Sequence, residues 1–274
     1  MSRSIPPFPP IPDDTTRAVS AVFGRGNIYR VIGDQVNSMF SEVDVSALDA
    51  SGGKSPENTP LLAILIMFQF AEDLPDRRAA DALRSRMDWK YALHQPLINP
   101  YLEYQKLCKF RSYCIHTSTT AEPLQKLVNR LAARGLFRDG CGQPLKISEI
   151  LLRVCFISRL EDITETILLA LEVLAAYQPE LLREKAAPHW YVRYDRQHIP
   201  FLMPDTSQAQ MELVQTIGED IVSLLQIMTC KGADRRLLPE VKKLQQILSV
   251  HYDNKTGKAI WRPDECAFCG QNGY

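Results

Sequence analysis

Eight basic side chains gather between residues 76 and 111, and their natural chemistry is the binding of a polyanion. They are Arg77, Arg78, Arg84, Arg86, Lys90, Lys106, Lys109 and Arg111. From Asp76 to Arg138 the chain holds 12 Lys and Arg against 5 Asp and Glu, although its net charge as a whole is zero. A basic block on helices in a neutral chain is typical of proteins that contact the DNA phosphate backbone. The alternative is an ordinary helical surface whose charges are simply solvated.

Other residues that could do chemistry form no complete site. Cys266 and Cys269 have the spacing of two zinc ligands, with His251 as a third candidate, but a closed structural zinc site needs four. Adjacent carboxylates, as in Glu161–Asp162 and Glu219–Asp220, point about 100° apart on a helix and are better suited to solvated faces or caps than to metal binding. The sequence has no phosphate-binding loop, dinucleotide fingerprint or nucleophile elbow. We therefore predict no catalytic residues, no metal and no cofactor.

The composition is that of an ordinary globular protein, with 45% apolar and 23% charged residues among 274. The seven cysteines are irregularly spaced, and the first residues, MSRSIPPFPP, lack the apolar stretch of a secretory signal. We expect reduced thiols and a cytoplasmic protein. The longest apolar run, Leu61 to Phe70, is about half the length of a membrane span, so no membrane association is expected.

Helical periodicity dominates the chain, and no series of strands is evident. The segment PLLAILIMFQF predicts a central buried helix, with Thr59 as its N-cap and an end near Pro75. Asp76 is expected to cap the next helix. Further helices are expected over about 29–40, 76–87, 102–116, 119–135, 148–177, 208–228 and 239–252, with a short one after residue 179. In the 102–116 helix, Lys106, Lys109 and Arg111 are expected to point outward.

These elements predict an all-α protein with two helical parts. A proline-rich disordered lead over residues 1–27 precedes a helical DNA-binding domain over residues 28–138. A second, more acidic helical segment covers residues 145–252, and an irregular tail with at most one strand covers residues 253–274.

The order of these segments resembles bacterial insertion-sequence transposases of the DDE type. The similar phrases are FQFAEDLPDRRAADALRSRMDWKYAL, KFR and RLAARGLF in the first part, and LLRVCFISRLEDITETILLALEVLAAY, HWYVRY and LPEVKKLQQILSVHY in the second. The first part resembles the N-terminal DNA-binding domain of that family. The second resembles a helical segment that one branch of the family carries after its first catalytic strand. This long ordered series covers most of the chain, about residues 31–261.

The resemblance implies an activity whose catalytic residues are not expected in this chain. Family members hold two metal ions, normally Mg²⁺, with three carboxylates on an RNase H-like core, and use them to cut and join DNA strands. Their first Asp lies just before the segment that corresponds to residues 151–161. In this chain that position corresponds to Lys146, with Ser148 and Glu149 nearby, and the later acids would lie beyond residue 274. A complete RNase H-like core is therefore not expected.

The function predicted is that of a truncated or degenerate transposase that binds the terminal inverted repeats of its element without cutting them. An alternative is a helical interaction module that pairs with itself or competes with full-length transposase, so that its basic surface is incidental. A further alternative is one half of an enzyme that a downstream reading frame completes.

Overall fold

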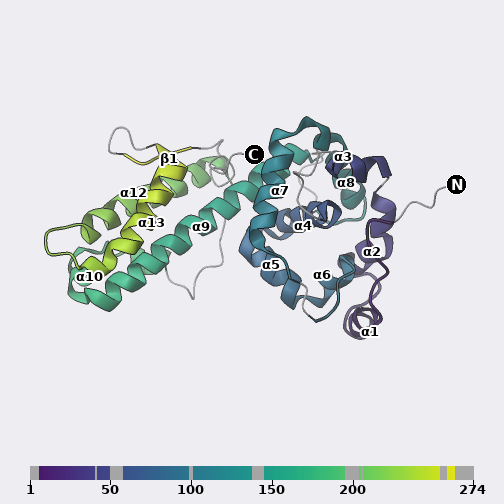
Figure 1. The fold of residues 1–274 in the computed structure, drawn as a ribbon, viewed down its shortest axis with the longest axis horizontal. Helices are drawn as coiled ribbons and strands as arrows, with labels where there is room; N and C mark the ends of the chain where they lie inside the picture. The colour runs from purple at the N-terminus through teal and green to yellow at the C-terminus, as the bar shows by residue number, and fades with distance from the viewer. Residues whose placement is uncertain are drawn as a thin grey trace. The chain divides into compact units, whose positions relative to one another are not determined.

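The computed structural model describes residues 6–40, 42–49, 58–98, 101–137, 145–194, 204, 206–253 and 258–262 (Figure 1). Within these residues the chain forms thirteen α-helices, three short 3-10 helices and one two-stranded sheet. This confirms the predicted all-α class. The chain divides into two compact units, unit 1 over Met1–Ser158 and unit 2 over Arg159–Gly273. The boundary differs from the predicted one near residues 138–145, because α9 begins in unit 1 and continues into unit 2.

Unit 1 contains the basic block. Its helices are α1 (Asp13–Val22), α2 (Ile28–Gln35), η1 (Val36–Met39), α3 (Glu42–Asp49), α4 (Thr59–Glu72), α5 (Asp76–Ser85), α6 (Met87–Ala92), α7 (Tyr104–His116), η2 (Ser118–Thr120), α8 (Ala121–Ala132) and the first turns of α9 (Ile147–Tyr177). Helices α2 and α6 pack together, as do α4 with α7 and α5 with α7. The helix predicted over 29–40 is thus α2 followed by a 3-10 turn.

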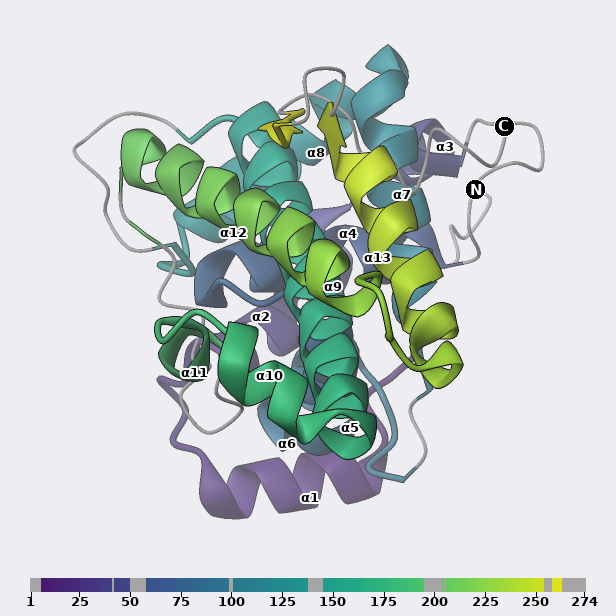
Figure 2. The same cartoon turned by 90° about the vertical axis from the view of Figure 1, so that its left-hand side faces the viewer.

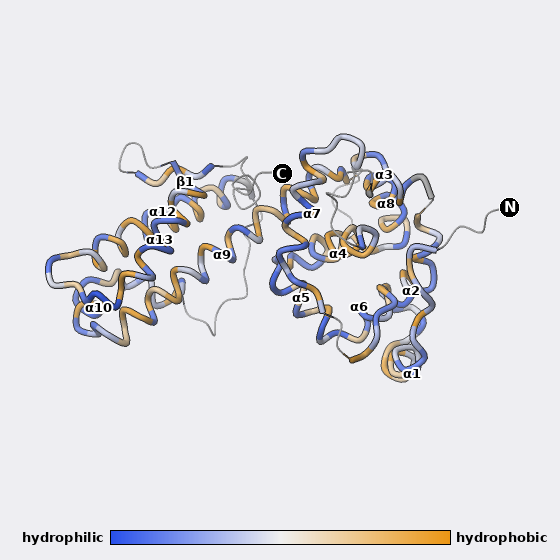
Figure 3. Tube along the Cα trace, in the orientation of Figure 1, coloured by the Kyte–Doolittle hydropathy of each residue, from blue (hydrophilic) through white to orange (hydrophobic). Residues whose placement is uncertain are grey.

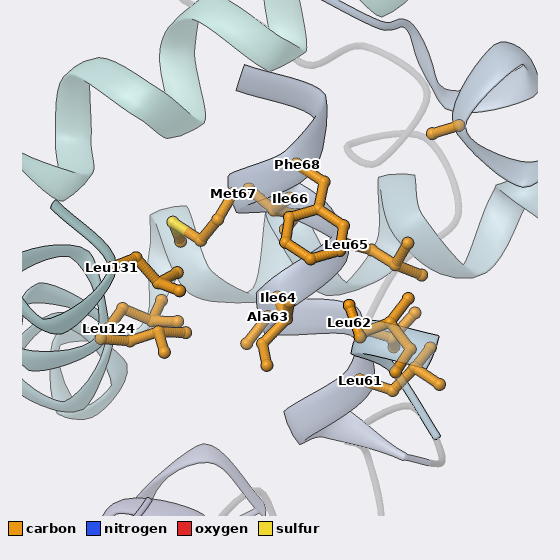
Figure 4. Packing of buried hydrophobic residues seen from close by; sticks show 14 of the residues in the cluster. Leu61, Leu62, Ala63, Ile64, Leu65, Ile66, Met67, Phe68, Leu124 and Leu131 are labelled. Carbon is orange, nitrogen blue, oxygen red and sulfur yellow. The ribbon is translucent and has the colours of Figure 1, made fainter. Parts of the chain in front are cut away.

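The centre of unit 1 is α4, as its sequence predicts. Every residue from Thr59 to Gln69 is buried, and the trace of this helix is largely orange in Figure 3. Figure 4 shows Met67 pointing toward Leu131 of α8, with Leu124 alongside. A helix that is apolar on all sides has to be enclosed by others, and α4 therefore fixes the positions of the helices around it. Thr59 is the first helical residue and not the N-cap, which is Asn58.

Part of the N-terminal segment that the sequence predicts as a disordered lead forms a helix. Within 1–27, residues 13–22 form α1, whose Thr15 and Val19 are buried. The Thr15 hydroxyl donates to the carbonyl oxygen of Gln95 at 2.9 Å. Phe8 is buried too, with its ring centroid 5.8 Å from that of His94. The proline-rich segment therefore packs onto the loop after α6.

Unit 2 contains the second half of the predicted helices. After the last turns of α9 it consists of α10 (Pro179–Lys185), α11 (Trp190–Arg193), α12 (Ser207–Met228), η3 (Arg235–Leu237), α13 (Leu238–His251), and strands β1 (Tyr252–Asp253) and β2 (Ile260–Trp261). Helices α12 and α13 run beside each other (Figures 1 and 2). The strands pair antiparallel, with Tyr252 opposite Trp261, so the predicted irregular tail contributes Asp253 and strand β2 to a small sheet.

A buried carboxylate organises the short helix α11. Asp220 of α12 accepts hydrogen bonds from the Trp190 indole at 2.7 Å and the Tyr194 hydroxyl at 2.8 Å. Arg193 donates to the same carboxylate, and His189 Nε2 lies 3.2 Å from it. Glu219 beside it is exposed. The two adjacent acids therefore have different environments, whereas the sequence predicted solvated or capping roles for both.

Two helical glycines mark places where another part of the fold comes very close. A Cβ at Gly33 in α2 would lie 2.7 Å from the ring of Tyr91 in α6. A Cβ at Gly218 in α12 would lie 2.6 Å from the ring of Tyr252 in β1. Neither distance leaves room for a methyl group, so each glycine is required by packing in its own unit.

Candidate nucleic-acid interface

Helix α7 has an inner face and an outer face of different character. The inner face carries Leu107, Phe110, Arg111 and Cys114, all buried, at the i, i+3, i+4 and i+7 spacing of a core stripe. Arg111 is therefore directed inward, with only 1% of its surface exposed, and the prediction that it points outward is wrong. Its position on the apolar stripe is the signal in the sequence that indicates this orientation.

Arg111 forms a buried ion pair with Asp76, the first residue of α5. Nη1 and Nη2 donate to Oδ1 and Oδ2, each at 2.8 Å. Burial alone lowers the pKa of Arg111, but the charge of Asp76 and its hydrogen bonds outweigh that effect and raise the pKa well above its usual value. The Gln69 amide also donates to Asp76 Oδ1 at 2.8 Å. Asp76 is thus a buried partner that joins α5 to α4 and α7, and not the helix cap that the sequence predicted.

Two more of the eight basic residues are engaged within unit 1. Lys90 is 5% exposed, and its ammonium donates to the carbonyl oxygen of Leu97 at 2.6 Å. Arg86 forms ion pairs with Asp88 and Glu72 and lies 5.0 Å from the ring centroid of Trp89. These contacts connect α6 to the end of α4 and to the loop that follows α6, so both side chains stabilise the fold.

The other five basic residues are wholly or partly exposed on α5 and α7. They are Arg77, Arg78, Arg84, Lys106 and Lys109. Arg77 and Arg84 are seven residues apart and therefore lie on one stripe of α5. Arg77 lies 5.0 Å from the ring centroid of Tyr104, at the start of α7, and Arg84 pairs with Asp81 at the surface. Lys106 and Lys109 lie on the outer face of α7, away from its buried stripe. The structure thus places exposed and partly exposed cations on two helices that pack against each other.

Among the described residues, no three His, Cys, Asp or Glu side chains are grouped to hold a metal ion. Lys146 and Glu149 are both exposed at the start of α9. Cys266 and Cys269 lie outside the described residues. In the described part of the chain, no helix is both long enough and apolar enough to cross a membrane.

The part of the chain that carries these cations also matches a known protein family in sequence. Residues 17–113 match the family model described as Transposase domain (DUF772). The match runs from α1 into α7 and includes all eight basic residues singled out above. It supports a transposase-related protein and covers less than half of the chain. No curated protein and no solved structure matches the chain.

Proposed function

We propose that this protein is a transposase-derived DNA-binding protein that recognises the terminal inverted repeats of an insertion sequence. The observation that carries the proposal is the coincidence of two features on α5 and α7. Helix α5 and the part of α7 up to residue 113 fall within the transposase-domain match, and the two helices carry five exposed or partly exposed cations. Arg77, Arg78, Arg84, Lys106 and Lys109 would contact the duplex, whereas Arg86, Lys90 and Arg111 would support the surface from within. Such a protein acts where the DNA of its element is, in the cytoplasm.

The proposal includes binding without strand cleavage. At the position that corresponds to the first catalytic Asp of DDE transposases the chain has Lys146, and a cation cannot take the place of a carboxylate as a metal ligand. Glu149 is exposed one turn further along but falls in a different register of α9. Mg²⁺ would be expected only for an intact member of that family. A chain that occupies the repeats without cutting them would compete with full-length transposase.

The test is a binding titration of the whole chain with two duplexes, one carrying the terminal repeat of the element and one with the same bases scrambled. Four to five phosphate contacts predict that log K falls with log salt with a slope of about −4. The titration is made at two salt concentrations, with and without Mg²⁺. Repeat-specific binding and intact strands are the expected result. Cleavage with Mg²⁺ would show that the chain is catalytic, and equal weak binding to both duplexes would refute repeat recognition.

A second candidate function, a helical interaction module, is favoured by the surface of α11. There Val192 is 78% exposed and Tyr191 is also exposed, although both are large and apolar. Apolar side chains next to each other on a surface are typical of contacts with another protein. The partner would be a second copy of the chain or the full-length transposase. Sedimentation of the chain without DNA distinguishes the two functions, because self-association that is insensitive to salt, without duplex binding, supports this second one.

A further inference from the structure

The outer face of α7 carries a straight stripe of polar side chains. Gln105, Lys109, Ser112 and His116 are spaced i, i+4, i+7 and i+11, which places them within an arc of about 60° on the helix. Lys109 and His116 are exposed, and Gln105 and Ser112 are partly exposed. This stripe lies opposite the buried stripe that contains Leu107 and Arg111. It therefore faces away from the core of unit 1.

The charge of α7 sets it apart from the other helices of unit 1. Among the described residues of unit 1, every α-helix except α7 contains at least one Asp or Glu. Helix α5, its neighbour, contains Asp81 on its exposed side. An acidic side chain would be repelled inside a groove lined by phosphates on both sides. The composition of α7 is thus compatible with entry into a DNA groove, whereas the composition of α5 suits contact from outside.

The side-chain chemistry of the stripe matches the edges of bases in the major groove. Lys suits the O6 and N7 acceptors of guanine, Gln suits the N6 and N7 groups of adenine, and Ser pairs with either. With thirteen residues, α7 is about 20 Å long, and the major groove is wide enough to admit an α-helix. Arg77 and Arg84, on the adjacent α5, would lie near the phosphates beside that groove.

The anchoring of α7 supports this geometry. Its inner face is held by the paired hydrogen bonds between Arg111 and Asp76, and by the burial of Leu107 and Phe110 without measurable exposure. A helix fixed in this way presents its outer side chains in a constant register, and such pre-organisation reduces the entropy that is lost on binding.

From these observations we propose that the stripe of α7, Gln105, Lys109, Ser112 and His116, enters the major groove and determines the sequence preference. The arginines of α5 provide affinity that does not depend on sequence. This inference rests on the proposed DNA-binding function and assigns different roles to the two helices, sequence preference to α7 and sequence-independent affinity to α5.

The test uses the full chain and a pool of duplexes with a randomised central segment, from which bound molecules are recovered and sequenced. The α7 variant carries Q105A, K109A and S112A, and the α5 variant carries R77A and R84A. A matched control carries K242A and Q245A, two exposed residues of α13 with the same chemistry. Circular dichroism verifies that each variant retains its helices.

The α7 variant is expected to lose the enriched motif and about 10- to 100-fold of its affinity for the selected duplex, with little change for a scrambled duplex. The α5 variant is expected to keep the motif, to lose affinity equally for both duplexes, and to have a salt slope smaller by about 2. The control should behave as the unsubstituted chain. An unchanged motif in the α7 variant would overturn the inference while the proposed function stands. If the unsubstituted chain binds no duplex at all, the proposed function itself fails.

Discussion

Both units of this protein bury a carboxylate, and they neutralise it in different ways. In unit 1, Asp76 is met by a guanidinium that is itself enclosed, because Arg111 is 1% exposed. In unit 2, Asp220 accepts from the neutral donors Trp190 and Tyr194, and its cationic partner Arg193 keeps about a quarter of its side chain exposed (26%). Burial, together with the charge of Asp220, raises the pKa of Tyr194 and keeps that hydroxyl a donor.

The difference shows that the position of a basic residue on a helix decides whether its charge is used within the core or is presented at the surface. Arg111 and Lys109 lie two residues apart on α7, yet one completes the core and the other faces away from it. In unit 2 the partners of the buried carboxylate all come from one short segment, residues 189–194, whose side chains contact Asp220. The contrast between the two units can be tested by substitutions that affect one of them at a time.

The largest effect is expected from Arg111→Met, which leaves the Asp76 carboxylate buried without its cation. A broken buried ion pair costs about 3–5 kcal/mol of unfolding free energy. Hydrogen exchange of the α4, α5 and α7 amides measures this loss in unit 1, with Lys109→Met as the matched exposed control. Adding Asp76→Leu to Arg111→Met should restore most of the stability. A loss no larger than that of the control would show that the pair is not what stabilises this unit.

Asp220→Asn is expected to weaken unit 2 by a smaller amount. The amide keeps one acceptor oxygen but loses the charge that strengthens the bonds from Trp190, Tyr194 and Arg193, each of which contributes about 1.5–3 kcal/mol when its acceptor is charged. A partial loss of about 2–3 kcal/mol should appear as a lower urea midpoint of unit 2, reported by hydrogen exchange of the α12 amides. Glu219→Gln, next to it and exposed, is the control. Equal effects of the two substitutions would contradict the role given to Asp220.

A dependence on pH is expected from His251, which is buried in unit 2. Burial, and then the charge of Arg159, lower its pKa to about 3, and its Nδ1 accepts from Arg159 Nε at 3.1 Å. The unfolded chain takes up a proton near pH 6.5 that the folded chain excludes. As far as His251 is concerned, the unfolding free energy of unit 2 has its full value above pH 6.5. It decreases as the pH drops toward 3, by about 2 kcal/mol at pH 5.

Urea unfolding between pH 7 and pH 4.5 measures this contribution. His251→Gln keeps a side-chain acceptor for Arg159 but has no group that titrates, and should flatten the pH dependence. An identical slope in the variant would assign the effect to other groups.

The smallest effect on stability, and a large one on binding, is expected from reversing the charge of Lys106 and Lys109 together. Both lie outside the buried stripe of α7, so helicity and unfolding should be nearly unchanged. Duplex binding should be lost, as measured by fluorescence anisotropy. Including Arg111 in such a variant would confuse the result, since its charge belongs to the core. Unchanged binding by the double variant would remove α7 from the interface.

Long, strongly periodic segments could be predicted from the sequence to within a residue. Helix α9 was expected over 148–177 and is found over Ile147–Tyr177, and α4 is the buried helix that its uniform apolarity indicates. The short helix after residue 179 is also found, as α10, but the short helix α1 is not predicted. Helix α1 begins with Asp13 and Asp14 directly after Pro12, which are typical start signals, but the neighbouring prolines favoured a disordered segment. Its stability comes from tertiary contacts such as that of Thr15 with Gln95.

The candidate interface could be predicted as a set of basic residues but not sorted into exposed and buried members. The partner of Arg111 lies 35 residues earlier in the chain, and the donors to Asp220 lie 26 to 31 residues before it. Side-chain type alone gives no information about such distant partners. Only the i, i+3, i+4, i+7 pattern around Arg111 indicated its orientation, and the general preference of Arg for the surface outweighed that pattern.

The two helical glycines without room for a Cβ allow either unit to be disturbed separately. Gly33→Ala would force a carbon against Tyr91, and Gly218→Ala would force one against Tyr252. The first substitution is therefore expected to destabilise unit 1 and the second to destabilise unit 2, with the full length of the chain kept. A cell that carries either allele would reveal which half of the protein its phenotype depends on.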